Sequence, residues 1–162
     1  VDYRLGKRTR FTENIQKQSR IPSGELVRAM VLPADANVAK HLHLRKGAPV
    51  VLIESVGKVD GRPISVVAHH FPAKRFPDMI EIYKRERSVT KALAHYGIDD
   101  YTRKETRITA RLPNAGEARL LELPRSQPLL VTESVNVDLE GRVIEFGWGR
   151  MAAERTQLVV QP

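Results

Sequence analysis

The sequence predicts an α+β fold, with a central, mostly antiparallel sheet of about six strands and helices packed on it. Three observations predict this class. A unit of helix, strand, turn and strand occurs twice along the chain, and strand-like runs rich in β-branched residues alternate with segments of helical period. No Gly/Ser-rich linker divides the 162 residues, a length that suits one domain of ~100–200 residues.

The repeated unit is the strongest of these observations. Residues 39–56 read AKHLHLRKGAPVVLIESV, and residues 118–135 read ARLLELPRSQPLLVTESV. The matching positions are Ala39, Leu42, Leu44, Pro49, Glu54, Ser55 and Val56, which recur as Ala118, Leu121, Leu123, Pro128, Glu133, Ser134 and Val135. Because the match runs through a helix, a turn and a strand, we infer an internal duplication with two-fold pseudo-symmetry and a cleft where the halves meet.

The first half begins with the basic stretch VDYRLGKRTR. A short helix, TENIQKQSR, follows with Thr12 as its N-cap, and then a strand at 24–34. The segment DANVAKHLHL has apolar residues at helical spacing, and the RKG after it predicts the helix end. Two β-branched runs, 49–59 and 64–71, form a hairpin because the Asp-Gly between them tolerates positive φ.

A helical region joins the two halves. FPDMIEIYKRER is a helix or turn, and SVTKALAHYGI is a helix with Ser88 as N-cap and Gly97 as its C-terminal stop. The alternating residues 101–112 then form a long strand. The second unit supplies the helix AGEARLLEL, the strand PLLVTESVNV and the strand VIEFGWGRM. QLVV closes the chain as an edge strand.

Composition and charge narrow the class of protein. The 27 Lys+Arg against 19 Asp+Glu give a net charge of +8, which attracts anions, but the charge is spread along the chain and no nucleic-acid-binding motif is visible. No apolar run approaches the ~18 residues of a membrane span, and no secretory signal is visible. The absence of cysteine fits a reducing cytosol. We therefore expect a cytoplasmic protein with no membrane partner.

The sequence shows no catalytic motif, no metal-ligand set and no cofactor-binding loop. GxSxG, GxGxxG, GxxxxGK[ST] and HExxH are all absent. The neighbours His69 and His70 lie late in a strand, where their rings point to opposite faces. The repeated Glu-Ser pairs at 54–55 and 133–134 are either a symmetric cleft lining or strand residues that the duplication preserved. We expect no catalytic residue, no metal and no cofactor.

Residues 85–91, RERSVTK, favour the binding of an anion. A helix N-terminus presents free backbone N–H groups and a partial positive charge. Ser88 and Thr90 add hydroxyls there, and three neighbouring cations raise the potential. RTRFTEN, residues 8–14, shows the same combination. The alternative interpretation of both segments is an ordinary N-cap among solvated arginines.

The order of the motifs carries a family resemblance. A Phe-Thr-Glu helix start precedes Leu-x-Leu-x-x-Gly-x-Pro-Val, an Asp-Gly-x-Pro-Ile hairpin, a Ser-x-Thr helix ending in Tyr-Gly-Ile, and a second helix–hairpin unit. From about Arg10 to Thr156 the chain thereby resembles the effector-binding (UTRA) domain of GntR-family transcription regulators of the HutC type. The resemblance implies a chorismate-lyase-like fold without that enzyme's activity. It also implies a homodimer.

The resemblance further implies a winged-helix DNA-binding domain, which this chain lacks. Residues 1–9 are then a remnant of the interdomain linker, and residues 10–162 form the single effector-binding domain. DNA is expected as a partner only through the missing domain.

The resemblance also implies positions that contact a ligand. Ser88 and Thr90 fall where relatives contact a phosphate-like group, and Phe11 and Thr12 match a loop that closes over the ligand. Glu145 matches an acidic position that touches ligand hydroxyls in sugar-phosphate-sensing members.

One departure from the family pattern affects the ligand. Sugar-phosphate-sensing members often carry an Arg-x-Arg pair on the first-hairpin strand, where this chain has Ser55 and Gly57. Without these two arginines, a bidentate clamp on an anion is lost. The groups expected to supply the missing charge are Arg10, His70, Arg107 and Arg150, and Ser55 is expected to line the ligand site.

We therefore expect a ligand-sensing and dimerisation module of a transcriptional repressor that binds a small anionic metabolite, a phosphonate or phosphate compound. Two alternatives stay open. The first is a lyase-like enzyme acting on an aromatic or phosphorylated acid, with Glu145 or His70 as acid or base. The second is direct nucleic-acid binding through the +8 charge, which predicts a steep salt dependence.

Overall fold

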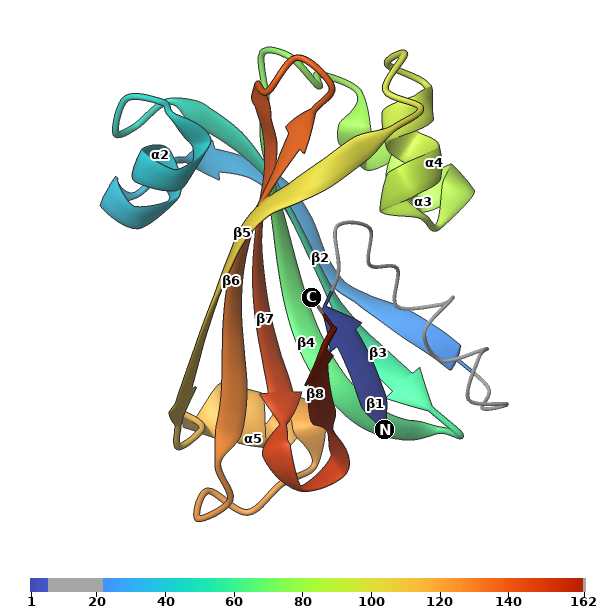
Figure 1. Cartoon of the computed structure of the whole chain (residues 1–162), viewed down its shortest axis with the longest axis vertical. Coiled ribbons are helices and arrows are strands. Elements are labelled where there is room, and N and C mark those ends of the chain that lie inside the picture. Colours follow the sequence, from blue (N-terminus) through green and yellow to red (C-terminus); the bar gives the residue numbers. More distant parts are fainter. Residues whose placement is uncertain (6–21, 162) are drawn as a thin grey trace.

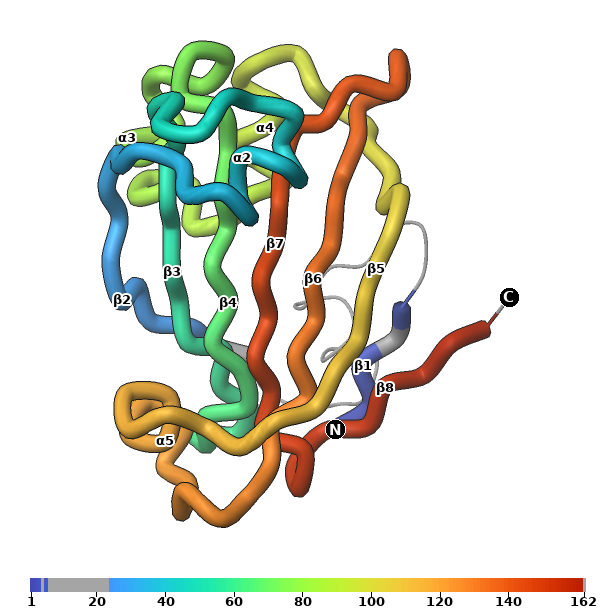
Figure 2. Tube along the Cα trace, turned by 90° about the vertical axis from the view of Figure 1, so that its left-hand side faces the viewer, coloured from blue at the N-terminus to red at the C-terminus, as the bar shows by residue number. Residues whose placement is uncertain are grey.

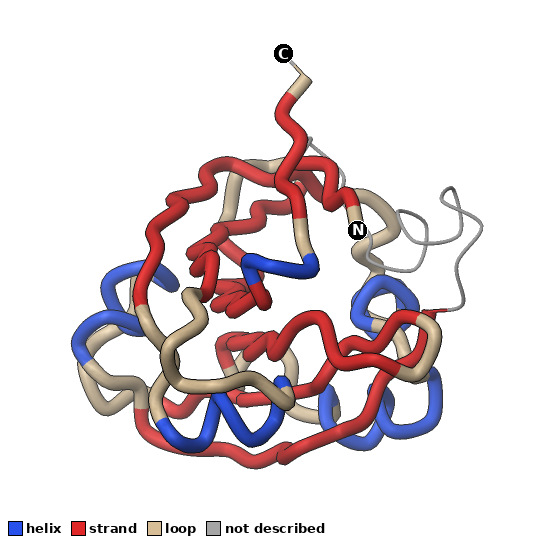
Figure 3. Tube along the Cα trace, turned by 90° about the horizontal axis from the view of Figure 1, so that it is seen from below, coloured by secondary structure: helices blue, strands red, loops and turns tan. Residues whose placement is uncertain are grey.

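The computed structural model describes residues 1–5 and 22–161. Its main sheet is six-stranded and antiparallel throughout, in the order β2-β3-β4-β7-β6-β5 (Figure 1). The strands are β2 (Pro22–Pro33), β3 (Pro49–Val59), β4 (Arg62–Pro72), β5 (Tyr101–Arg111), β6 (Leu129–Asp138) and β7 (Val143–Ala152). Seen from below, the sheet curls rather than lying flat (Figure 3). The predicted α+β class and the number of strands are confirmed.

The strand order reflects the duplication. One unit is β2, α2 (Ala36–Leu42), β3 and β4, and the other is β5, α5 (Ala115–Leu121), β6 and β7. The two units meet where β4 pairs with β7, so β3 and β6 flank the centre and β2 and β5 form the edges. Both α2 and α5 cross the same face of the sheet (Figure 2). The arrangement agrees with the two-fold pseudo-symmetry inferred from the repeat.

The two repeated helices end in the same way, and this corrects the predicted end of α2. The helix ends at Leu42, ahead of RKG, because His43 adopts left-handed backbone with φ of 56°. The next N–H, that of Leu44, then donates to the carbonyl of Ala39 at 2.9 Å. Glu122 plays the same role after α5, with φ of 52°. Neither helix end has the glycine that would mark it in the sequence.

Two further helices cover the opposite face. α3 (Met79–Glu86) and α4 (Val89–Ala94) lie behind the sheet in Figure 2. Ser88 is the N-cap of α4, as predicted, and accepts from the N–H of Lys91 at 3.2 Å. Gly97 has φ of +76° after the helix, a conformation that favours glycine. The core on this side contains Val51, Ile53, Phe71, Phe76, Met79, Ala92, Leu93, Ile98 and Ile144.

The chain ends form a second, two-stranded sheet. β1 (Asp2–Leu5) pairs in parallel with β8 (Gln157–Val160), after a 3₁₀ turn, η1 (Ala153–Arg155). QLVV is a strand, as predicted, but it pairs with β1 and does not extend the edge of the main sheet. Sequence reasoning predicted no strand at residues 2–5, because their pairing partner lies at the other end of the chain. In Figure 1, β1 and β8 lie on the same side of the sheet as α3 and α4.

Gly149 on β7 provides a test of the packing between the central strands. A Cβ at this position would lie 2.5 Å from the hydroxyl of Thr132 on β6, whereas a Cβ at Gly147 would meet nothing within 4 Å. We expect Gly149→Ala to lower the free energy of unfolding by ~1–3 kcal/mol, because an added methyl forces a close contact in a packed sheet. Urea denaturation measures the loss, with Gly147→Ala as the control. Equal losses for the two variants would contradict this account of the contact.

None of the helices in residues 1–5 and 22–161 is both long and apolar enough to cross a membrane.

Candidate functional site

The residues that sequence reasoning assigned to one ligand site lie on two opposite faces of the sheet. On the face that carries α3 and α4 lie Ser55, Ser88, Thr90 and Glu145. On the face that carries α2 and α5 lie His70, Arg107 and Arg150. Outside the described residues lie Arg10, Phe11 and Thr12. The structure therefore does not bring the predicted set together in a single site.

On the α3/α4 face, five polar side chains form what we call the Arg103–Glu145 cluster. Its members are Tyr3, His69, Arg103, Asn136 and Glu145. Asn136 on β6 lies between Arg103 and Glu145. It pairs with Arg103 on β5 and with Glu145 on β7. Its amide donates to Glu145 at 2.7 Å, and His69 Nδ1 donates to the other carboxylate oxygen at 2.6 Å. Arg103 in turn lies close enough to Tyr3, which comes from β1, to act on the pKa of its hydroxyl.

The cluster keeps Glu145 ionised and Tyr3 neutral. Burial acts to raise the pKa of Glu145, but the charge and hydrogen bond of His69, the Asn136 amide and the Arg103 charge outweigh it, so the pKa is lowered. Burial raises the pKa of Tyr3 above its ordinary value, although Arg103 opposes this. At neutral pH the cluster therefore presents a carboxylate, a guanidinium and an uncharged phenol.

Thr90 connects α4 to the same face. Its hydroxyl lies 2.8 Å from the hydroxyl of Tyr101, which stands two residues before Arg103 at the start of β5. Figure 1 shows this end of β5 running toward α4. Ser88 accepts from a backbone N–H as the cap, and its own hydroxyl proton can still be donated. Because α4 has only six residues, we attribute its contribution to these hydroxyls and not to a helix dipole.

Arg103 is the member of the cluster with an unmet hydrogen bond. Its Nε is buried and has no hydrogen-bond partner among the described residues. Sequence reasoning missed Arg103, His69 and Tyr3 as site residues. The sequence places Arg103 two positions after Tyr101 on a strand, and so on the same face, but it does not mark either residue as part of a site.

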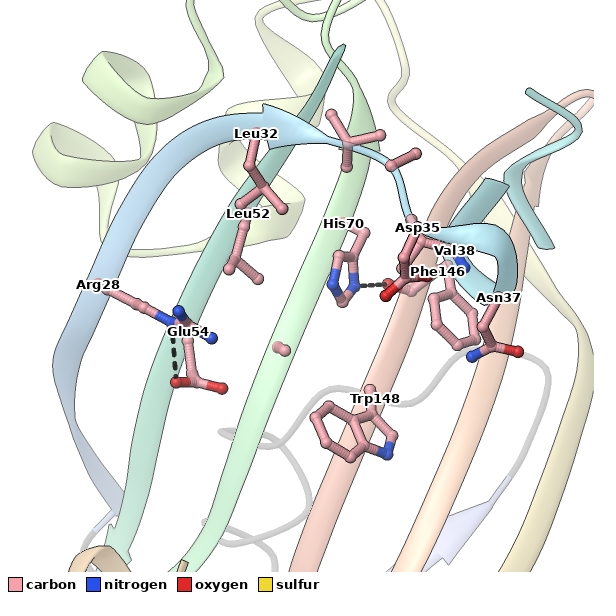
Figure 4. A pocket seen from close by; sticks show the side chains of 13 residues that line it. Arg28, Leu32, Asp35, Asn37, Val38, Leu52, Glu54, His70, Phe146 and Trp148 are labelled. Carbon is pink, nitrogen blue, oxygen red and sulfur yellow. Dashed lines mark hydrogen bonds and ion pairs between the residues drawn. The ribbon is translucent and has the colours of Figure 1, made fainter. Parts of the chain in front are cut away.

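A separate hollow of about 280 Å³ lies on the α2/α5 face (Figure 4). Its lining comes from both halves, including His70 on β4 and Phe146 and Trp148 on β7. His70 Nδ1 donates to the carbonyl of Phe146 at 3.1 Å, which leaves Nε2 as an acceptor. Burial lowers the pKa of His70, so its ring is neutral at pH 7. A neutral imidazole supplies no charge to an anion.

The charged groups around this hollow are already paired. Glu54 binds Arg28 at 3.3 Å through one carboxylate oxygen and Arg150 at 2.7 Å through the other. The guanidinium of Arg150 also stacks on Trp148, 3.9 Å from the ring centroid. Asp35 adds a further carboxylate to the lining. Among the described residues, the hollow therefore offers an anion no cation without a carboxylate partner.

Arg107 stands apart from both groups. It is exposed on edge strand β5, and its Nε donates to Glu105 at 3.1 Å. In the described part of the chain, no group of three or more His, Asp or Glu side chains is arranged to hold a metal ion.

The comparison with protein families decides what kind of domain this is. The model of the UTRA domain family matches residues 17–157. The chain belongs to the UTRA domain family. This agrees with the resemblance seen in the order of the sequence motifs.

Relatives of this UTRA domain are transcriptional regulators. An uncharacterised HTH-type transcriptional regulator of Rhizobium meliloti is 40% identical over 161 residues, which cover 99% of this chain and 66% of that protein. The HTH-type transcriptional repressor PhnF of Mycolicibacterium smegmatis is 31% identical over 135 residues, which cover 83% of this chain and 55% of that protein. This chain thus spans less than two thirds of the length of these relatives. Their names support a regulatory and not an enzymatic role.

Solved structures show the same fold. The crystal structure of PhnF from Mycobacterium smegmatis has a TM-score of 0.91 at 28% identity, covering all of this chain and 71% of that one. The effector domain of the same protein has a TM-score of 0.87 at 25% identity, covering 100% of this chain and 99% of that one. The chain is therefore a PhnF-like UTRA domain, and the chorismate-lyase-like fold implied by the resemblance is confirmed.

Proposed function

We propose that this UTRA domain senses a small anionic metabolite, a phosphonate or phosphate compound, and binds it beside the Arg103–Glu145 cluster. The observation that carries the proposal is the guanidinium of Arg103. Its buried Nε lacks a partner among the described residues, and an unmet buried donor costs ~1–3 kcal/mol. An anion oxygen at this position would satisfy that donor through a charge-assisted hydrogen bond.

The surrounding groups complete a site for an anion with a polar substituent. Thr90 and Ser88 supply hydroxyl donors from α4, and Thr90 is joined to the strand of Arg103 through Tyr101. Glu145 keeps acceptor capacity for a hydroxyl or an amino group of the ligand, since each of its oxygens accepts one hydrogen bond. The phosphonate or phosphate class is favoured by the similarity to PhnF.

The wider assembly is part of the proposal. Relatives are longer than this chain, and a winged-helix DNA-binding domain joined through residues 1–9 accounts for part of the difference. In this proposal the domain forms a homodimer in the cytoplasm, and the ligand controls DNA binding by the separate domain. The required coupling is small, since ~1–3 kcal/mol of differential affinity between two states is enough.

The double variant Ser88→Ala/Thr90→Ala tests the site. We expect it to bind inorganic phosphate and methylphosphonate at least ~10-fold more weakly than the unaltered chain, because two hydroxyl donors of about 1 kcal/mol each are lost. Isothermal titration calorimetry measures the affinity. Thr109→Ala, an exposed threonine on β5, is the control and should bind normally. Unchanged affinity in the double variant would remove α4 from the site.

A further inference from the structure

We propose that the hollow on the α2/α5 face is a second binding site, which takes a small protonated amine with an apolar body. The hollow lies across the sheet from the Arg103–Glu145 cluster. The proposal goes beyond the anion site and does not depend on it, because the two sites share no residue and attract opposite charges.

The size and the walls of the hollow suit a small organic molecule. Its volume is about 280 Å³, just below the ~300–1,000 Å³ of pockets that hold drug-sized ligands. Most of the lining is apolar, and it includes Leu52 on β3 and Phe146 and Trp148 on β7. These walls can cover the body of a ligand, so the few polar groups among them decide its chemistry.

His70 presents an unmet acceptor to this hollow. The residue is buried, with 8% exposure, and it pairs with Leu52 on β3 and with Phe146 on β7. Nδ1 donates to the Phe146 carbonyl at 3.1 Å, and Nε2 has no partner among the described residues. Figure 4 shows this second nitrogen turned away from Phe146, toward Leu52 and Glu54. A buried acceptor without a partner favours a ligand that donates N–H or O–H.

The charge of the lining favours a cation. Its charged residues are Arg28, Asp35 and Glu54. Glu54 is held by Arg28 and Arg150, at 3.3 and 2.7 Å, whereas Asp35 has no ion pair among the described residues. One Asp35 oxygen accepts from the Val38 N–H at 2.8 Å, as the N-cap of α2, which leaves the other oxygen for a ligand. The uncompensated charge at the hollow is therefore negative.

A protonated amine suits these acceptors. An ammonium group carries three N–H donors and no acceptor, so it can bond both to a carboxylate and to a neutral imidazole. Burial lowers the pKa of His70, so the ring stays neutral at pH 7 and does not repel the cation. A bond from a charged donor to a carboxylate is roughly twice as strong as a bond between neutral groups. A phosphate or phosphonate, in contrast, would be repelled by the Asp35 carboxylate.

Trp148 gives a direct readout, because it is the only tryptophan of the chain and it lines the hollow. We expect benzylamine to change the tryptophan fluorescence in a saturable way. Benzyl alcohol and benzoate, which share its ring, should bind at least ~10-fold more weakly. Asp35→Asn should weaken benzylamine binding ~10-fold, since it removes the charge but keeps a good N-cap. His70→Leu should weaken it ~5-fold through the lost acceptor.

Asp78→Asn is the matched control. Asp78 precedes α3 on the other face and makes no side-chain cap hydrogen bond, so losing its charge should leave the amine affinity unchanged. No saturable response to benzylamine, equal binding of benzoate, or unchanged affinity in either hollow variant would overturn the proposal. Tryptophan emission that depends on protein concentration and not on the amine would also overturn it, and would place a second copy of the chain over the hollow. Phosphate titration of the same chain tests the anion site separately.

Discussion

Replacing Glu117 by alanine is expected to lower the free energy of unfolding by about 3–5 kcal/mol, the range for breaking a buried ion pair. Glu117 lies on α5 and is 2% exposed. Arg111 at the end of β5 binds both of its carboxylate oxygens, at 2.7 and 2.8 Å, and Arg150 approaches at 3.4 Å. Its loss leaves the buried Arg150 short of a partner.

The same carboxylate also begins the helix. It accepts from the Asn114 N–H at 3.0 Å, while the Asn114 side chain accepts from the Glu117 N–H at 2.8 Å. This reciprocal capping box contributes ~1 kcal/mol. Glu117→Gln keeps an oxygen for the cap and removes only the charge. It should therefore lower the free energy of unfolding less than Glu117→Ala does.

Urea denaturation checks the Glu117 prediction. Glu140→Ala is a suitable control, because Glu140 pairs with Arg142 at 2.6 Å but is exposed on the β6–β7 turn, where such a pair is worth ~0–1 kcal/mol. A loss below 1 kcal/mol for Glu117→Ala would contradict the role assigned to the pair.

The pH dependence gives a second readout for the same residue. The hydrogen bond from Arg111, opposed by burial and helped by the Asn114 N–H, lowers the pKa of Glu117 to about 2 from 4.5. A lowered folded-state pKa means that the stabilisation is complete above about pH 5 and disappears as the pH falls toward 2. Between pH 7 and pH 3 the chain should lose about 2 kcal/mol through this group. Glu117→Gln should not show this pH-dependent loss of unfolding free energy.

Arg103→Ala is expected to weaken binding of phosphate or methylphosphonate by ~100-fold, or ~2.7 kcal/mol. The reason is that the variant removes the one guanidinium in the cluster, and hydrogen bonds to charged groups are worth ~1.5–3 kcal/mol. Isothermal titration calorimetry measures the change. Arg103→Lys keeps the charge but not the planar donor set, so it should recover only part of the affinity.

Arg107→Ala is the matched control for Arg103. Arg107 stands on the same strand, is exposed, and is already bonded to Glu105. The Arg107→Ala variant should bind the anion as tightly as the unaltered chain. A larger loss from Arg107→Ala than from Arg103→Ala would place the anion on the other face of the sheet.

Most of the fold could be predicted because its signals are local or repeated. The β-branched runs and Asp-Gly turn specify the first hairpin, and the repeat of residues 39–56 at 118–135 implies the symmetric sheet order that is observed. The β1–β8 pairing could not be predicted, since its partners lie at opposite ends of the chain. The left-handed ends at His43 and Glu122 also lacked the usual glycine.

The site was less predictable, because a side chain's face depends on strand register. Arg150 and Glu145 are five residues apart on one strand, yet they lie on opposite faces of the sheet. Their odd spacing already predicts opposite faces of a strand, but only the pairing of β7 with β4 and β6 shows which of the two side chains joins the face of α3 and α4. Arg103 was missed because it looks like any charged residue on an edge strand. Only the tertiary structure sets Arg103 apart, because it places Arg103 beside Tyr3, Asn136 and Glu145.

The most direct test of the anion-sensor account is a thermal-shift panel on the unaltered chain and on Arg103→Ala. The panel holds phosphate, alkylphosphonates, aminophosphonates and sugar phosphates, with uncharged sugars and alcohols as controls. A ligand at a hundred times its Kd should add ~2.7 kcal/mol and raise Tm by roughly 5–10 °C. The account predicts this rise with one phosphonate or phosphate class, and its loss in Arg103→Ala. No shift with any anion, or an equal shift in the variant, would contradict it.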